Sequence, residues 1–271
     1  MKTRIFLFLL VGLFFLPTAA DAQLRKMDYI PFIKGEKLKY KAYYDSYVTG
    51  HVNAGEGVFE IKKNSREVAG RQCMHVVANW YTLGAFNLFF KVRDRYESFI
   101  DEEAIVPWLH IRRVKEGGYT ISQDVTFNHY NNTTHFKNNK NGQTNVQSVP
   151  PNIQDIISVL YYARCWDVSN VKIGDFIPLQ FTLDDTVFTT NMYYRGKETI
   201  KTSAGTFKCL VVKPQVLMGN VFDNEFPMTL WVTDDKNHIP VMGQSEVIVG
   251  VVKMELLEYS GLKYPLTSKV K

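Results

Sequence analysis

A strict two-residue alternation between Glu36 and Tyr44 constrains the fold more than any other feature of this sequence. In an extended chain, one face would carry three lysines and the other four apolar or aromatic residues, namely Leu38, Tyr40, Ala42 and Tyr44. Because successive side chains of a β-strand point to opposite faces, this pattern predicts a half-buried strand with a lysine-coated solvent face.

Similar short segments recur along the chain, rich in aromatic and β-branched residues and separated by clusters of Gly, Asn and Asp. They are Met74–Trp80, Phe90–Ile100, Tyr119–His129, Ile177–Leu183, Phe188–Tyr194, Phe207–Lys213, Met228–Thr233 and Glu246–Leu257. Many strands divided by turn signals favour antiparallel over alternating βαβ architecture. We therefore predict a mainly β fold: two similar curved antiparallel sheets, as a half-barrel or open barrel, with one central amphipathic helix.

The centre of the chain interrupts the strand pattern. The Asn-rich stretch from Asn131 to Asn145 predicts a long turn or mobile loop. Beyond Pro150 and Pro151 the apolar spacing becomes helical, through Ile153, Ile156, Ile157, Leu160, Tyr161 and Arg164. We expect a helix over residues 152–165, with Asn152 as N-cap and the Asp155 carboxylate reaching back to the cap.

The two halves of the chain around this helix carry similar turn residues and strand segments in the same order. The matches are Gly35 with Gly174, Ala69–Val77 with Ala204–Val212, Asp101 with Asp234, Pro107 with Pro240, and Gly117 with Gly250. Their offset stays between 133 and 139 residues. We expect one exported β domain over 23–271, with duplicated halves at 33–130 and 172–258 joined by the Asn-rich loop and the helix. Independent hairpins that look alike are the alternative.

The N-terminus has the pattern of a secretory signal peptide. Lys2 and Arg4 precede an apolar run over residues 5–16, and the small-residue pattern Ala20-Asp21-Ala22 follows. The run is too short to cross a hydrocarbon core of about 30 Å as a helix, and no later segment reaches roughly 18 apolar residues. We therefore expect a signal peptide over 1–22, cleavage after Ala22, export to the periplasm of a Gram-negative bacterium, and no transmembrane segment in the mature chain. A retained membrane anchor is the alternative.

The charge balance argues against a nucleic-acid partner. The whole chain has 32 basic and 27 acidic residues, and removal of Lys2, Arg4 and Asp21 leaves 30 and 26. This small excess, spread without long runs of like charge, supports neither nucleic-acid binding nor membrane steering. The three cysteines, Cys73, Cys165 and Cys209, form no C-x-x-C pair and permit at most one intramolecular disulfide, so we interpret them as buried small apolar residues.

Catalytic and cofactor motifs are missing from the sequence. There is no glycine-rich phosphate loop, and Gly243-Gln244-Ser245-Glu246-Val247 lacks the closing glycine of a nucleophile elbow. The six histidines show no metal-ligand spacing, so we predict neither a metal nor a cofactor. The acidic pairs at 102–103, 184–185 and 234–235 fall at expected turns, which favours solvated turn residues over catalytic carboxylates.

Two polar groups stand out from this background. On the segment Val92–Ser98, alternation places Asp94 on an otherwise apolar face, where a carboxylate needs a partner. Arg112, Arg164 and Lys115 are candidates for that partner, in a structural ion pair or a ligand contact. The second group is the helix face with Asp155, Ser158 and Tyr162, which faces solvent, a partner or a cavity. Our candidate ligand-binding residues are Tyr40, Tyr44, Trp80, Asp94, Tyr96, Arg112, Asp155, Tyr161, Arg164 and Trp231.

Four segments in order give a family resemblance. Gly35–Tyr40, Val92–Asp101, Gln154–Arg164 and Trp231–Val241 resemble the exported bacterial family called domain of unknown function 3108, over about Gly35 to Leu257. This resemblance implies an exported bacterial protein that lies outside the cytoplasm, but it implies no mechanism. The hairpin at Trp231–Val241 is also similar to one in outer-membrane lipoprotein carriers. That similarity implies a curved sheet folded around a helix, with an apolar cavity for acyl chains.

These observations leave three functional hypotheses. The first is a non-catalytic envelope protein that binds a lipid, an acylated protein or another apolar envelope component, motivated by the export signal, the 14% aromatic content and the absence of a catalytic signature. The second is an envelope hydrolase acting on glycan or peptidoglycan through Asp94 and Asp155, which requires the two carboxyls to converge in an open cleft. The third is a structural or adhesive surface module, which requires a filled core and an exposed apolar patch.

Overall fold

The computed structural model describes residues 24–46, 50–84, 86–215, 226–246 and 250–270, so the predicted signal peptide and its cleavage site lie outside the described residues. The strands are β1 (Lys37–Ser46), β2 (Gly50–Ile61), β3 (Arg66–Val68), β4 (Arg71–Thr82), β5 (Arg93–Asp101), β6 (Pro107–Glu116), β7 (Tyr119–Asn128), β8 (Thr133–Asn138), β9 (Thr144–Ser148), β10 (Gln154–Asp155), β11 (Phe176–Leu183), β12 (Thr186–Thr202), β13 (Gly205–Pro214), β14 (Met228–Thr233), β15 (Pro240–Glu246) and β16 (Val251–Ser260). Two short helices accompany them, α1 (Phe86–Phe89) and α2 (Ser158–Arg164). The fold is mainly β, as the sequence predicts.

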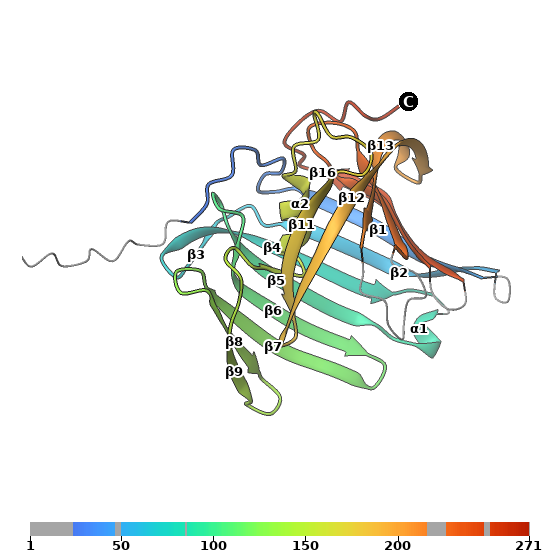
Figure 1. The fold of residues 1–271 in the computed structure, drawn as a ribbon. Helices are drawn as coiled ribbons and strands as arrows, with labels where there is room; N and C mark the ends of the chain where they lie inside the picture. Colours follow the sequence, from blue (N-terminus) through green and yellow to red (C-terminus); the bar gives the residue numbers. More distant parts are fainter. Residues whose placement is uncertain (1–23, 47–49, 85, 216–225, 247–249, 271) are drawn as a thin grey trace, which may run out of the picture.

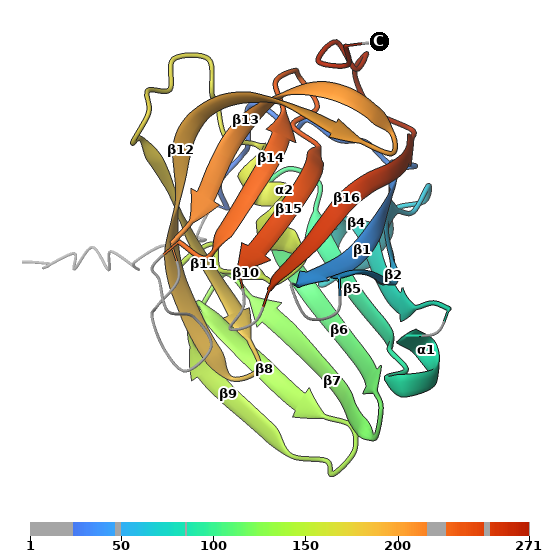
Figure 2. The ribbon, with the colours of Figure 1, turned by 90° about the vertical axis from the view of Figure 1, so that its right-hand side faces the viewer.

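The strands form one continuous sheet. Its order is β10-β11-β12-β13-β14-β15-β16-β1-β2-β4-β5-β6-β7-β8-β9, with β3 paired to β4. The expectation of two sheets is not confirmed, because β1 pairs with β16 over most of its length and joins the two halves of the chain edge to edge. The sheet curls strongly without closing into a barrel (Figures 1 and 2).

The alternation in β1 produces the expected burial. Leu38 and Tyr40 are almost completely buried. Lys39 and Lys41 lie on the opposite face and pair with Glu56 and Glu255 of the neighbouring strands. Cross-strand pairs of this kind add modest stability to a sheet.

Helix α2 is shorter than predicted, and Asn152 does not cap it. Asn152 has a left-handed backbone with φ of 57°, and the next residues form β10, which pairs in parallel with β11. The Asp155 carboxylate takes over the cap, because its Oδ1 accepts the backbone N–H groups of Ile157 and Ser158, each at 2.7 Å. This is the usual way to satisfy free N–H groups at the start of a helix.

The helix packs against both halves of the sheet. Ile157, Tyr161 and Cys165 belong to a buried cluster with residues of β2, β4 and β5. Val159 belongs to a second cluster, with residues of β11, β12 and β13. We call the face of the sheet that carries α2 the inner face. Neither described helix has the length and apolar content to cross a lipid bilayer.

Two predicted segments differ from the structure. The Asn-rich stretch forms the hairpin of β8 and β9, held by side-chain turns such as Asn138 Oδ1 accepting the N–H of Lys140 at 2.9 Å. The segment Glu246–Leu257, expected as one strand, covers the end of β15 and most of β16. The duplication stays a prediction. In its support, each matched glycine pair, such as Gly35 with Gly174 and Gly117 with Gly250, has positive φ in both halves.

The three cysteine thiols are buried and unpaired. Burial raises the pKa of each thiol to about 12, so each stays protonated at neutral pH. Since the thiolate is the reactive form, Cys73, Cys165 and Cys209 behave as small apolar residues, in line with our interpretation.

A buried ion pair fixes the end of α2. Arg164 donates to both carboxylate oxygens of Glu36, at 2.6 and 2.8 Å, and Arg164 Nη2 also donates to the backbone oxygen of Asn237 at 3.0 Å. The side chains are only 5% and 1% exposed. Burial alone would lower the pKa of Arg164, but the Glu36 carboxylate outweighs it and raises that pKa above its usual value. The contact joins α2 to the residue before β1 and to the β14–β15 loop.

We predict that Arg164→Met lowers the free energy of unfolding by about 3–5 kcal/mol, because it leaves the Glu36 carboxylate buried without its partner. The measurement is urea unfolding followed by circular dichroism. The control is Lys197→Met, which removes the exposed pair with Asp234 and costs at most about 1 kcal/mol. Equal losses in the two variants would contradict a central role for the buried pair.

Candidate functional site

The structure divides the predicted site residues into two groups. Tyr40, Tyr161 and Arg164 are buried around the Glu36 ion pair, where they pack the core and reach no open surface. The Tyr40 hydroxyl donates to the backbone oxygen of Pro240 at 3.0 Å. Burial raises the pKa of both tyrosines above the usual value, so they stay neutral. This first group is structural.

The second group lies on the inner face of β4, β5 and β6. It contains Trp80, Asp94, Tyr96 and Arg112, with Asp155 close by at the start of α2. The register places Trp80 opposite Asp94, and Tyr96 opposite Arg112.

Asp155 is completely buried rather than exposed on a free helix face. Its Oδ2 accepts the hydroxyl of Ser98 at 2.5 Å and lies 3.6 Å from Nδ1 of His110. Its Oδ1 accepts hydrogen bonds from the backbone N–H groups of Ile157 and Ser158. The carboxylate therefore ties α2 to β5 and β6 and is not available to a substrate.

Asp94 is nine-tenths buried, and of its three expected partners it contacts Lys115, through the backbone N–H rather than the side chain. Its Oδ1 accepts the backbone N–H of Lys115 at 3.0 Å, and its carboxyl shares a hydrogen bond with Glu116. Of the expected partners, Arg112 pairs with Asp184 at 2.7 Å, and Arg164 with Glu36. Burial, and then the nearby Asp94 charge, raises the pKa of Glu116 from 4.5. The two acids form a carboxyl pair that favours holding a proton.

Apolar side chains continue across the inner face on β14, β15 and β16. Leu230, Gly243 and Met254 are register neighbours, and a Cβ added to Gly243 would lie 3.2 Å from Leu230 and 3.7 Å from Met254. Leu230 also packs against the cluster that contains Val159 of α2, so these side chains lie on the helix side of the sheet.

The apolar surface continues across β1 and β2, through Ala42 and Gly55, to Trp80 on β4. Met254 pairs with Ala42, and Ala42 pairs with Gly55. The Trp80 ring lies directly over Gly57, where an added Cβ would come within 2.3 Å of it. Gly57 and Gly243 therefore make room for large neighbouring side chains, while an added Cβ at Gly55 would meet the backbone of Tyr81 and Thr82. We call this set the inner apolar strip: Leu230, Gly243, Met254, Ala42, Gly55, Gly57 and Trp80.

The inner apolar strip is only partly covered. Leu230, Met254 and Trp80 each keep an intermediate exposure, and Val252, two residues before Met254 on the same face, is 44% exposed. The strip ends at the carboxyl pair of Asp94 and Glu116, next to Trp80. The arrangement offers an apolar surface with a polar border, which suits an apolar or amphiphilic ligand.

Two predicted residues lie outside the strip: Trp231 is on the outer face, and Tyr44 is beside the strip on the inner face, where it pairs with Val252. Trp231 is adjacent in sequence to Leu230, so alternation turns it to the outer face, where its indole N–H donates to Glu198 at 2.7 Å. Tyr44 lies near the end of β1, opposite Val52 and Val252, and is half-buried.

Sequence reasoning missed Leu230, Met254 and Glu116. The signal that could have found the strip is Gly55-Glu56-Gly57, two glycines spaced to share one face of a strand. Among the described residues, no group of three or more His, Cys, Asp or Glu side chains could hold a metal ion.

Comparison with known proteins places the chain in a family. The family model "Protein of unknown function (DUF3108)" matches residues 39–257. The chain belongs to the DUF3108 family. No curated protein matches the sequence.

A solved structure shares the fold at low sequence identity. The chain is similar to a β-barrel-like protein of domain of unknown function DUF1849 from Brucella abortus, with a TM-score of 0.57, 11% identity, and coverage of 86% of this chain and 100% of that one. An exported protein with a YmcC-like fold from Bacteroides fragilis aligns with a TM-score of 0.32 and 11% identity, covering 86% and 98%. A protein described as a lipoprotein from Parabacteroides distasonis gives 0.31 and 13%, covering 88% and 100%.

The carboxyl pair predicts a pH effect on stability. Because the pKa of Glu116 is higher in the folded than in the unfolded chain, the folded state binds more protons above 4.5, and stability falls as pH rises through that window. We expect Glu116→Gln to be more stable than the wild type near pH 7.5 and about equal near pH 4.5, in urea unfolding. The control is Glu67→Gln, at an exposed position on β3. An equal response of both variants would contradict the raised pKa of Glu116 beside Asp94.

Proposed function

We propose that this DUF3108 protein is an exported, non-catalytic envelope protein that binds a lipid, an acylated protein or another apolar envelope component on its inner apolar strip. The observation that carries the proposal is the strip itself. It crosses six neighbouring strands, from β14 to β4, on the concave side of the curled sheet, and its large side chains stay partly exposed. Contiguous exposed apolar surface with a polar border is typical of a binding site.

The position of α2 explains why the strip is open. The seven-residue helix packs on one part of the inner face, against the clusters that contain Met74 and Val212. A longer helix would cover more of the sheet. Because helix α2 ends at Arg164, the apolar side chains of the strip stay partly exposed, and an apolar ligand would bury them favourably at roughly 25 cal/mol per Å² of buried surface.

The buried carboxylates support a non-catalytic role. A glycoside hydrolase needs two carboxyls facing each other across a substrate cleft. Asp155 is fully buried and engaged by Ser98 and its own helix, while Asp94 is bound to the backbone of Lys115 and to Glu116. This geometry disfavours the hydrolase hypothesis. Export to the periplasm rests on the predicted signal peptide.

We predict that the purified mature protein takes up the uncharged probe N-phenyl-1-naphthylamine with a rise in its fluorescence. Leu230→Glu should weaken this uptake at least about tenfold, because a carboxylate in the strip must be desolvated when the probe binds. The control is Val146→Glu, which places the same charge on the exposed edge strand β9. Circular dichroism checks that both variants fold.

Two results would contradict this proposal. One is the absence of probe uptake by the wild-type protein. The other is equal uptake by both glutamate variants, which would locate the probe away from the strip. Native mass spectrometry of the protein purified from the cell envelope then identifies a co-purified lipid by its mass.

A further inference from the structure

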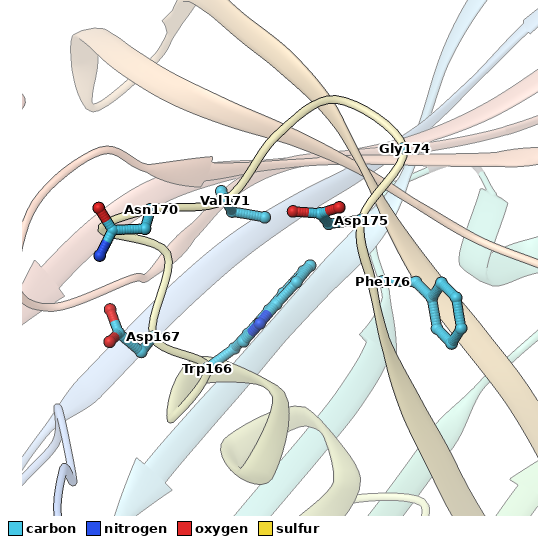
Figure 3. A pocket seen from close by; sticks show the side chains of 7 residues that line it. All are labelled: Trp166, Asp167, Asn170, Val171, Gly174, Asp175 and Phe176. Carbon is cyan, nitrogen blue, oxygen red and sulfur yellow. The ribbon is translucent and has the colours of Figure 1, made fainter.

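A pocket of about 490 Å³ opens beside the end of α2 (Figure 3). Its volume lies in the range of small-molecule sites, about 300–1,000 Å³. The segment that follows Arg164 and the start of β11 build it, with Trp166, Asp167, Asn170, Val171, Gly174, Asp175 and Phe176 as its lining. The function proposed above does not use this pocket.

Trp166 gives the pocket an aromatic wall. Its backbone N–H bonds to Ala163 of α2 at 3.2 Å, and its indole packs partly against the cluster that contains Val159. The backbone of Trp166 is therefore held by the helix, and its ring by a buried cluster of helix and strand residues. Val171 and Asp175 lie above the ring, and Phe176 lies on the other side of the strand (Figure 3).

The polar side chains of the pocket are carboxylates and an amide. Asp175 is fixed by its Oδ2, which accepts the backbone N–H of Lys172 at 2.8 Å, while no hydrogen bond to its Oδ1 is made within the described part of the chain. Asp167 Oδ1 accepts the N–H of Ser169 at 3.0 Å, which lowers the pKa of Asp167. Asn170 adds an amide that both donates and accepts. The lining contains no basic side chain.

The backbone holds these groups in place. Gly174 has φ of 100°, which glycine adopts freely, and its N–H donates to the backbone oxygen of Tyr194 at 2.9 Å. In return, the N–H of Tyr194 donates to the backbone oxygen of Asp175 at 2.8 Å. Asp175 is thereby anchored to β12, opposite a ring anchored to α2.

We propose that this pocket binds a neutral saccharide. A pyranose ring has an apolar C–H face that packs on an indole, and a rim of hydroxyls that donate to carboxylates and exchange hydrogen bonds with an amide. Trp166 supplies the first contact, and Asp167, Asn170 and Asp175 supply the second. Two carboxylates without a lining cation disfavour uronic acids and phosphorylated sugars, since like charges repel.

The test is isothermal titration calorimetry with saturation-transfer NMR on the mature protein. The neutral probes are maltotriose, cellotriose and tri-N-acetylchitotriose; trigalacturonate is the anionic probe and chitotriose the cationic one. We expect at least one neutral trisaccharide to bind at millimolar concentration and trigalacturonate not to bind. Trp166→Ala should weaken binding at least tenfold, and Trp166→Phe should retain part of it.

Matched variants separate the polar contacts from general charge. Asp175→Asn should weaken binding severalfold, while Asp185→Asn, at the exposed β11–β12 turn, should leave it unchanged. The proposal is overturned if no neutral trisaccharide binds, if folded Trp166→Ala binds as well as the wild type, or if chitotriose alone binds. Uptake of the naphthylamine probe is measured on the same variants, and its retention shows that the inner apolar strip is intact.

Discussion

The buried ion pair of Glu36 and Arg164 is the contact on which the rest of this structure depends. Glu36 precedes β1, the strand that joins the two halves of the chain into one sheet by pairing with β16. Arg164 ends α2, the one helix of the described residues that packs between those halves, and it also binds the β14–β15 loop through Asn237. Two charges in the interior are tolerated only because each satisfies the other. The pair thus fixes where the helix ends and how the sheet curls around it.

The position of the helix decides which parts of the inner face are core and which are open. Side chains near α2, such as Tyr161 and Val76, are buried, while Leu230, Met254 and Trp80 lie in the same layer and remain partly exposed. Glycines in the strip let these large side chains lie flat against the sheet. Two residues beyond Arg164, Trp166 packs against the same buried cluster as Leu230 and forms a wall of its pocket. The end of this short helix thus positions a second surface of different chemistry.

Local patterns predicted much of the fold. Alternation identified β1, and family resemblance identified the DUF3108 family, because both depend on short stretches of sequence. Strand β2 was missed, since Gly55 and Gly57 weaken a strand signal, although Gly57 packs against Trp80 and Gly55 against the backbone of β4. Prediction of the site required contacts between residues that are far apart in the sequence. The partner of Arg164 is 128 residues away, and whether Leu230 or its neighbour Trp231 faces inward depends on which side of the sheet the helix covers.

The central claim is that the inner apolar strip is a ligand-binding surface. NMR of protein labelled with ¹³C-methyl methionine tests it directly, because Met254 lies in the strip, Met242 on the outer face of the adjacent strand, and Met74 in the buried core. On titration with stearate, the account predicts a larger chemical-shift change for the Met254 methyl signal than for those of Met242 and Met74. Equal shift changes at Met254 and Met242, or none at Met254, would contradict it.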